Sequence, residues 1–239
     1  MVTQALGEIR IDRVVESEGG FAPASVVMPQ FDRAVLERDQ ADAWLRPRFM
    51  TADDILIMSF QSFVIRTGSL TILVDGCVGN DKERPRRETW HRRSSTAWLD
   101  QLAAIGLSPS DIDVVLCTHL HADHVGWNTV LRDGRWVPTF PRARYLFTRT
   151  EYDYWERAHR ASLAAGDPPT NHGSFADSVL PVMDAGRAEL VGDGHEVCAG
   201  VRIEPAPGHT PGNSVISVWG GGQRALITGD VVHTPVQIA

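Results

Sequence analysis

The chain has 239 residues, of which 43% are hydrophobic, so it is long enough for one sizeable core, and we expect a single domain over residues 1–239. Its formal net charge of -7 argues against nucleic acid as a partner, because phosphate recognition needs a basic face. Residues 1–20 carry charges without an apolar signal-peptide stretch, and no uncharged apolar run approaches the roughly 18 residues of a membrane span, so no membrane partner is expected.

The cysteines bear on the compartment. Cys77, Cys117 and Cys198 are scattered along the chain and form no C-x-x-C pair. An odd, scattered set is typical of small buried side chains in a reducing environment and not of a disulfide framework. We therefore expect a cytoplasmic protein, unless processing has already removed a leader.

The first fifty residues predict one strand and an irregular segment. Residues 9–15 alternate imperfectly between apolar and polar side chains, which indicates a strand. Residues 21–49 hold three prolines and scattered aromatic side chains, although a short helix fits residues 32–45. Two interpretations of this segment stay open: a lid or substrate-facing arm, or a segment that packs along one edge of the fold.

The next segment predicts a pair of strands and a charged loop. Residues 55–67 and 69–75 are mostly apolar and are typical of antiparallel strands joined at Gly68. Residues 82–93 then mix six basic side chains with acidic ones. One interpretation is a loop that recruits anions to a site entrance; we favour the other, a solvated surface loop. His91, inside this run, is a poor candidate for a metal ligand.

The middle of the chain predicts a strand–helix–strand unit. Residues 94–105 place apolar side chains at helical spacing, with Ser94 or Ser95 as the cap and Gly106 as the stop. Residues 113–117 are β-branched and aliphatic without polar alternation, the pattern of a strand buried on both faces. A strand, a helix and a buried strand in this order indicate a βαβ unit.

The C-terminal half predicts alternating helices and strands. We expect a surface connection at residues 130–141, a strand at 143–148, a helix capped by Thr150 at 150–165, a helix at 173–183, strands at 189–191 and 201–204, and a hairpin of residues 214–219 and 224–228 around Gly220, Gly221 and Gly222. Core packing is the favoured role of the aromatic residues in the first of these helices. His172, in a loop between two helices, is a weak candidate for a substrate contact.

The strongest chemical signal is the run of residues 118–127, which has the sequence THLHADHVGW. It places three imidazoles and a carboxylate within six residues, and both groups are preferred ligands of zinc and similar ions. Because the run follows a buried strand, it lies at the carboxyl end of the sheet, where α/β folds bind ligands. His119 and His121 can share one ion, while Asp123 and His124 point elsewhere and can serve a second. A purely structural role is the alternative, and this density of ligand-type side chains argues against it.

Two later turns present further candidate side chains. Residues 205–213 have the sequence PAPGHTPGN, whose glycines and prolines fix a tight turn that carries His209 out of the sheet. Residues 228–230, Thr-Gly-Asp, place Asp230 at the end of the following hairpin. By itself the GHTPG turn is a moderate signal of a functional site.

Together these motifs resemble those of the metallo-β-lactamase superfamily, in particular its lactonase and methyl parathion hydrolase-like branches. The GHTPG histidine lies 90 residues after His119 (209 minus 119), and Asp230 lies 21 residues after His209 (230 minus 209). The strand pair that ends in Asp75-Gly76 also matches the superfamily. The resemblance implies an α/β protein with the αββα sandwich of the metallo-β-lactamase fold.

The resemblance also assigns site residues. The implied metal ligands are His119, His121 and His209 for one ion and Asp123 and His124 for the second, with Asp230 bridging both. Asp75 is implied to buttress the histidine loop by fixing imidazole orientation, and a plain turn-forming aspartate is the alternative. His233 is implied to lie behind the ligands or in the substrate pocket, with a structural role equally open.

One departure from the family pattern concerns the C-terminus. Two-metal members supply a last histidine for the second ion from a strand beyond the bridging aspartate, whereas this chain stops at Ala239. We expect a C-terminally incomplete chain whose sandwich lacks its last strand and helix, which would leave an apolar edge uncovered and the second ion weakly bound. The alternative is that His233 or water replaces the missing ligand.

The implied function is metal-dependent hydrolysis of a small-molecule substrate with two zinc (Zn2+) ions. A hydroxide held between the ions attacks a carbonyl or phosphoryl centre, and Asp123 is the catalytic residue for the leaving-group proton. Opening of a lactone, or cleavage of an ester or organophosphate bond, is the favoured reaction. The alternatives are a glyoxalase II-type thiolester hydrolase, a β-lactamase, and an inactive metal-binding module. Asn213 weakens the first of these, since those enzymes, and many lactonases too, carry histidine at this position. A homodimer stays open.

Overall fold

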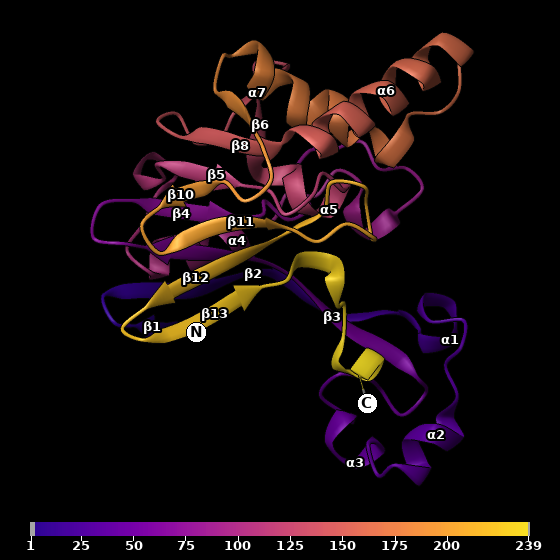
Figure 1. Cartoon of the computed structure of the whole chain (residues 1–239). Helices are drawn as coiled ribbons and strands as arrows, with labels where there is room; N and C mark the ends of the chain where they lie inside the picture. The colour runs from indigo at the N-terminus through magenta and orange to yellow at the C-terminus, as the bar shows by residue number, and fades with distance from the viewer. Residues whose placement is uncertain (1–2, 239) are drawn as a thin grey trace.

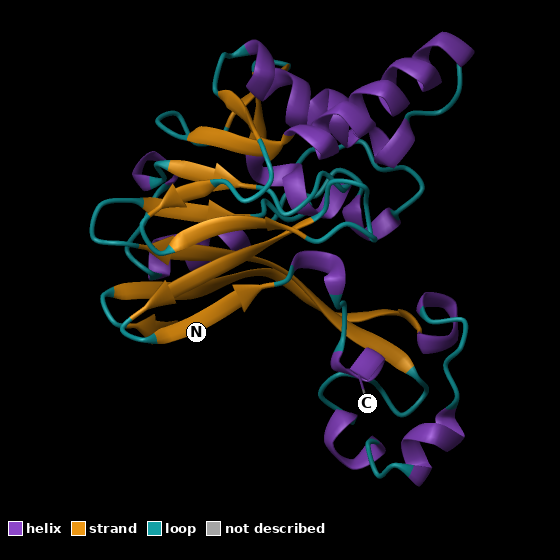
Figure 2. Cartoon of the chain, in the orientation of Figure 1, coloured by secondary structure: helices purple, strands orange, loops and turns teal. Residues whose placement is uncertain are grey.

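Two packed β-sheets form the centre of the molecule. The computed structural model describes residues 3–238, and its larger sheet has seven strands in the order β1-β2-β3-β4-β5-β8-β9 (Figures 1 and 2). These strands are β1 (Thr3–Leu6), β2 (Ile9–Pro23), β3 (Ile55–Arg66), β4 (Thr71–Val74), β5 (Val114–Leu116), β8 (Arg144–Thr148) and β9 (Ala188–Val191). Neighbours from β1 to β4 are antiparallel, and β4, β5, β8 and β9 are parallel. The parallel β4–β5 pair, connected through α4 (Ala97–Ala104), confirms the predicted strand–helix–strand unit.

The smaller sheet covers one face of the larger one. Its four antiparallel strands are β10 (Glu196–Cys198), β11 (Val201–Pro205), β12 (Ser214–Gly220) and β13 (Gln223–Ile227). Side chains such as Ile72 from the larger sheet and Ile203 from the smaller one share an apolar core between the sheets. Trp219 and Leu226, which alternate with inward-facing neighbours, are 36% and 49% exposed on the outer face.

Helices cover the opposite face of the larger sheet. They are α4, α6 (Arg149–Ala165), η5 (Phe175–Val179, a π-helical turn) and α7 (Leu180–Asp184). The largest core lies beneath them, and Trp98 of α4 stacks there on Trp127 with 5.0 Å between ring centroids. The layers are therefore helix, sheet and sheet, in agreement with the predicted sandwich. Among the helices of residues 3–238, none has both the length and the apolar character that crossing a bilayer requires.

A bulge in β2 turns one carboxylate into the core. β2 and β3 pair along almost their whole length, far beyond the strand predicted at residues 9–15, and the register shifts first at Glu16. Bulges redirect side chains next to functional sites, and Glu16 is only 5% exposed. Its carboxylate accepts hydrogen bonds from Val78 N (3.1 Å), Gly79 N (3.0 Å) and Trp127 Nε1 (2.8 Å). Burial raises the pKa of Glu16, and Arg93 and these hydrogen bonds oppose the rise.

Residues 24–50 form a small separate core near one end of β3. They hold α1 (Ala24–Val27), α2 (Arg33–Arg38) and α3 (Asp42–Leu45), and Figure 1 shows these helices projecting away from the two sheets. The short helix predicted within residues 32–45 is present as two, because Gln40 has a φ of +55° and separates α2 from α3. Val236, in η7 (Pro235–Ile238), is buried in the same cluster, so the end of the described chain packs on this arm.

Several predictions differ from the structure in local detail. The surface connection predicted at residues 130–141 is largely the hairpin β6 (Thr129–Arg132) and β7 (Arg135–Pro138), whose Asp133-Gly134 turn has positive φ at both residues. The cap of α6 is Thr148 and not Thr150. The helix predicted at residues 173–183 is η5 followed by α7, and β10 was not predicted. Other short helical turns are α5 (Ala122–Val125), η1 (Glu88–Trp90), η2 (Pro109–Asp111), η3 (Gly126–Asn128), η4 (Thr170–Gly173) and η6 (Gly229–Val231).

The solvated loop predicted at residues 82–93 is wrong in part. Lys82 and Arg84 are fully buried, whereas Arg86, Arg87 and Arg92 are exposed. Arg84 forms a bidentate pair with Asp177 of η5, with N–O distances of 2.6 and 2.9 Å. Lys82 Nζ donates to the Thr129 hydroxyl at 2.6 Å. A carboxylate and a hydroxyl from later in the chain thus replace water around these cations.

Candidate metal centre

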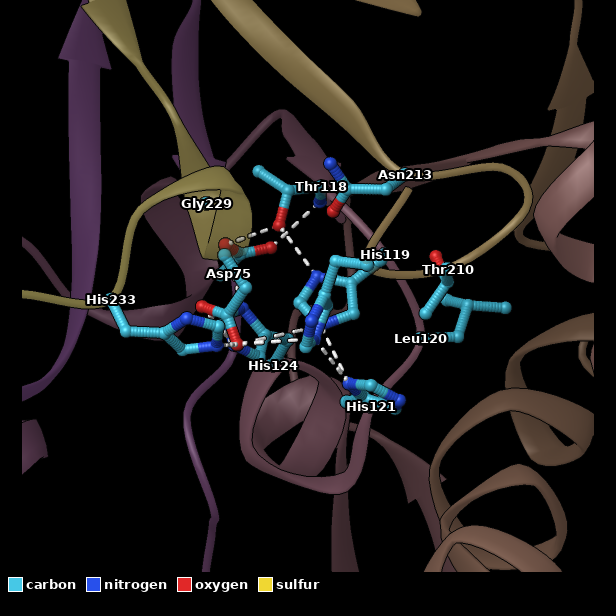
Figure 3. Close-up of polar contacts among 12 residues, drawn as sticks. Asp75, Thr118, His119, Leu120, His121, His124, Thr210, Asn213, Gly229 and His233 are labelled. Atoms are coloured by element: carbon cyan, nitrogen blue, oxygen red, sulfur yellow. Dashed lines mark hydrogen bonds and ion pairs between the residues drawn. The ribbon is translucent and has the colours of Figure 1, made fainter. Parts of the chain in front are cut away.

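Three loops bring the predicted ligands to one edge of the sheets. His119 and His121 lie in the loop after β5, and His124 lies in α5 directly beyond it. His209 comes from the loop between β11 and β12, and Asp230 comes from η6 after β13. Figure 3 shows the rings of His119, His121 and His124 converging, with Asp75 and Thr118 behind them. The edge is the carboxyl end of the parallel strands, where α/β sheets bind ligands.

One cluster consists of three imidazoles and a carboxylate. His121 Nδ1 lies 2.8 Å from His209 Nε2 and 3.0 Å from His119 Nε2. Asp230 Oδ2 lies 3.4 Å from His209 Nε2 and 3.9 Å from His119 Nε2. One ligand atom from each of these residues can be chosen so that all lie within 4.8 Å of one another.

A second cluster shares the same aspartate. Asp123, His124 and Asp230 also offer ligand atoms within 4.8 Å of one another. Asp230 Oδ1 lies 3.2 Å from His124 Nε2, while its Oδ2 faces the three-histidine cluster. Each oxygen of one carboxylate therefore serves a different cluster, the arrangement that a pair of bridged ions requires.

The chemistry of the first cluster fits a divalent cation. Burial lowers the pKa of His119 and His209 and lowers that of His121 to about 4, so these rings are neutral at neutral pH. Three neutral rings that face one another place nitrogen lone pairs in mutual contact, which a cation relieves. Zinc–nitrogen bonds of about 2.1 Å in a tetrahedron separate ligand atoms by about 3.4 Å, close to the spacing here.

The second cluster carries a proton where a cation would sit. Burial favours neutral His124, but Asp230 and Asp75 on either side outweigh it and raise its pKa well above the usual value. Burial also raises the pKa of Asp230, yet the charge of His124 and hydrogen bonds from His124 and His233 reverse this and hold the pKa low. An ion bound here would replace the proton on His124.

Asp75 orients two of the rings. It accepts hydrogen bonds from Thr118 N and Thr118 Oγ1, both at 2.8 Å, and from His124 Nδ1 at 3.0 Å. Thr118 Oγ1, having donated to Asp75, accepts from His119 Nδ1 at 3.1 Å. Both rings therefore turn Nε2 toward the clusters, which is the contact expected of a residue that buttresses the histidine loop.

The remaining predicted residues lie at the margin of the clusters. His233 Nε2 is 3.2 Å from Asp230 Oδ2, and its ring centroid is 5.1 Å from that of His209. Burial raises the pKa of Asp123, and His124 opposes the rise. His91 lies elsewhere, and its Nδ1 accepts from Arg84 N at 3.0 Å. The ligand and catalytic roles of all these residues stay predictions.

An aromatic cleft of about 380 Å³ opens beside the clusters. Its floor is formed by His121, Asp123, His209, Asp230 and His233. Its walls include Phe21, Val27, Met58, Phe60, Trp90 and Trp155, with Arg87, Asn171 and His172 among its polar residues. Phe21, at the second bulge of β2, and Val27 of α1 line this cleft, so the start of the irregular segment at residues 21–49 faces it, while later residues of the segment pack in their own cluster. Among these wall residues the sequence indicates His172 as a weak substrate contact and leaves a substrate-facing arm open for residues 21–49. It favours core packing for Trp155, because isolated aromatic side chains carry no signal of a shared surface.

A double-sheet sandwich with two histidine and aspartate clusters at one edge defines an α/β protein built around a candidate metal centre. The chain belongs to the metallo-beta-lactamase superfamily, whose family model matches residues 61–239. The predicted family resemblance and fold are therefore confirmed.

Curated relatives are N-acyl homoserine lactonases. The chain is 36% identical over 56 residues to the lactonase AttM of Agrobacterium fabrum, covering 23% of this chain and 18% of the relative. It is 25% identical over 117 residues to the lactonase AiiA of Bacillus thuringiensis subsp. kurstaki, covering 49% of this chain and 37% of the relative. The matches thus span well under half the length of these relatives.

Solved structures share the fold across nearly the whole chain. A probable metal-dependent hydrolase from Staphylococcus aureus superposes with a TM-score of 0.72 at 18% identity, covering 95% of this chain and 74% of that one. The dizinc quorum-quenching lactonase AidC, solved with a product, superposes with a TM-score of 0.64 at 19% identity, covering 94% and 72%.

Proposed function

We propose that this protein is a zinc-dependent hydrolase that opens lactones or cleaves carboxylic esters bearing an apolar arm. The observation that carries the proposal is the placement of Asp230, with one oxygen in each cluster, on the floor of the aromatic cleft. The lactonase relatives support the same class of substrate.

In this proposal the two clusters hold the metal. His119, His121, His209 and Asp230 bind one ion, and Asp123, His124 and Asp230 bind the other. Bound together, two such ions supply a water of lowered pKa and a Lewis acid for the substrate oxygen. The protein contributes fixed ligand orientation through Asp75, and burial keeps the imidazoles of His119, His121 and His209 neutral.

The chain's own side chains position the substrate. An apolar arm lies along Phe60 and Trp90, whose ring centroids are 5.6 Å apart, and this contact excludes water from the cleft. The reacting carbonyl then sits at the cluster floor near His209 and His233. Asp123, which reaches the same cleft, takes a proton from the attacking water and passes it to the leaving alkoxide, which departs as the alcohol.

A combined metal and activity measurement tests the proposal. The purified chain is analysed for zinc, manganese, iron and cobalt, then assayed on lactones, aryl esters, phosphotriesters and lactoylglutathione before and after treatment with a chelator. We expect about two zinc ions per chain, lactone or ester hydrolysis that the chelator abolishes, and recovery on adding Zn2+. A metal-free chain without activity on any substrate, or activity indifferent to the chelator, would refute it. Preference for phosphotriesters or lactoylglutathione would overturn the substrate class.

A further inference from the structure

A buried carboxylate lies between the two loops that carry His121 and His209. Glu151 is in the first turn of α6 and is 1% exposed. Among the ion pairs of residues 3–238, none involves Glu151, and its carboxyl group is held by hydrogen bonds instead. It accepts four of them, two on each oxygen, from Leu120 N (3.0 Å), Trp155 Nε1 (2.7 Å), Thr210 Oγ1 (2.7 Å) and Gly212 N (3.0 Å).

The two oxygens of Glu151 hold different loops. Oε1 binds the backbone of Leu120, the residue between His119 and His121. Oε2 binds the hydroxyl of Thr210, the neighbour of His209, and the backbone of Gly212. One rigid side chain therefore sets the spacing of two loops that are about ninety residues apart in the sequence (209 minus 119).

The second loop packs directly on the start of α6. A Cβ atom added to Gly212 would lie 2.6 Å from Glu151 Cα and overlap its backbone nitrogen. The Thr148 hydroxyl, at the cap of α6, donates to the Gly212 carbonyl at 3.0 Å. The absence of a side chain at residue 212 is therefore what allows the loop to reach Glu151.

The backbone around His121 has a second support. Asn171 Nδ2 donates to Leu120 O at 2.6 Å, and Asn171 Oδ1 accepts from Ala122 N at 3.1 Å. Asn171 has a φ of +49°, which asparagine tolerates better than most residues. The Trp155 ring, whose indole N–H is bound by Glu151, lies 5.4 Å from the His121 ring.

We propose that Glu151 is a positioning residue that fixes the distance between His121 and His209, and thereby the zinc affinity and ligand geometry of the three-histidine cluster. The inference rests on the metal centre of the proposed function. Glu151 is not one of the candidate ligands and does not line the cleft, so it acts on the cluster through Leu120 and Thr210, while another of its partners, Trp155, lies in the cleft wall. Replacing a partner that orients metal ligands costs about 10- to 100-fold in affinity or activity.

The substitution Glu151→Gln tests the inference selectively. The glutamine amide replaces one carboxylate oxygen by an NH2 group, which must face one of the two pairs of donors. It is expected to face Thr210 and Gly212, because the Thr210 hydroxyl can turn and accept a hydrogen bond, although the Gly212 N–H cannot. The His209 loop is therefore released while the Leu120 contact remains. Thr210→Val removes one bond to the same oxygen, and Thr210→Ser keeps it. Glu156→Gln, on the same helix and in a partly exposed ion pair with Arg160, is the matched control.

The readouts separate metal geometry from activity. Zinc affinity of the metal-free chain is measured by competition with a chelating dye, and the visible absorption of bound Co2+ reports ligand geometry. For Glu151→Gln we expect about 10- to 100-fold weaker zinc binding and an altered Co2+ spectrum. Thr210→Val should change both in the same direction by less. Glu156→Gln and Thr210→Ser should match wild type.

Failure of this inference is distinguishable from failure of the proposed function. Wild-type affinity and Co2+ spectra in Glu151→Gln and Thr210→Val would overturn the positioning role while leaving hydrolysis intact. Weakened zinc binding in these variants, with no hydrolysis by a zinc-loaded wild-type chain, would support the role and refute the function. If wild type binds no zinc, both fall. Should Glu151→Gln fail to fold by circular dichroism, the Thr210→Val and Thr210→Ser pair decides the question.

Discussion

Lys82 is the single lysine of the chain, and its burial makes a titration experiment unusually direct. It is 0% exposed, and its Nζ lies 3.6 Å from the centroid of the Trp136 ring and 3.7 Å from Asp177 Oδ1. Asp177 is already paired with Arg84, so one carboxylate faces two cations. Burial lowers the pKa of Lys82 to about 7; Asp177 opposes the fall and Arg84 adds to it.

The sign of the pH dependence follows from this lowered pKa. Between pH 7 and about 10.4 the unfolded chain keeps the proton on Lys82 while the folded chain has lost it. Because the unfolded state then binds more protons, the free energy of unfolding rises with pH across this window and is lowest below pH 7. At about 1.4 kcal/mol per pKa unit, the full effect is of the order of 5 kcal/mol, of which about 2 kcal/mol falls between pH 7 and 9.

Lys82→Met removes this contribution and leaves the Arg84–Asp177 pair in place. The free energy of unfolding is measured by urea denaturation for wild type and for Lys82→Met at pH 7 and pH 9. We expect it to increase between these pH values by about 2 kcal/mol more in wild type than in the variant. Arg86→Met, which changes an exposed cation of the same loop, should follow wild type. With 13C-labelled lysine, wild type should show one side-chain resonance titrating near pH 7. A midpoint near 10, or parallel stability curves for wild type and Lys82→Met, would refute the reasoning.

Three further outcomes are expected. Gly126→Ala should lower the free energy of unfolding by more than about 3 kcal/mol in urea denaturation, because the new Cβ overlaps the Val78 carbonyl; Gly68→Ala, with open space around it, should stay within about 0.5 kcal/mol. Asp230→Asn should reduce bound metal below that of wild type by elemental analysis, since it removes the charge shared by both clusters; unchanged metal content would contradict the bridging role. Trp90→Ala should raise KM about tenfold for long-chain lactones or esters and leave metal content and short-chain kinetics unchanged; equal effects on both substrates would argue against the apolar wall.

The candidate ligand set was predictable because its chemistry is local. Residues 119–124 concentrate metal-binding groups after a buried strand. His209 and Asp230 lie in turns that the neighbouring glycine and proline residues predict. The resemblance then joined these turns to one site, and the structure brings their side chains together. The Asp133-Gly134 pair is a sequence signal of a two-residue hairpin turn, so the β6–β7 hairpin was also predictable, although residues 130–141 were predicted as a surface connection.

Burial of charge was not predictable in the same way. The run of residues 82–93 alternates buried and exposed cations, and nothing within it distinguishes Lys82 and Arg84 from Arg86. What decides their burial is Asp177, about ninety residues later (177 minus 84), together with the Thr129 hydroxyl. Likewise Glu151 resembles an ordinary acidic residue in the first turn of a helix, and only the approach of Leu120 and Gly212 gives it four donors.

The sequence by itself therefore determined the family, the strand order around the β4–β5 unit and the residues that offer metal ligands, since each depends on short-range pattern. The tertiary structure decided which carboxylates hydrogen-bond to the loops that carry these candidate ligands, which cations are buried and which aromatic side chains share the cleft. The physical reason is that hydrogen bonds and apolar contacts are made between pairs of atoms. Here those atoms belong to segments far apart in the chain, and the local sequence of each segment does not indicate which other segment it contacts.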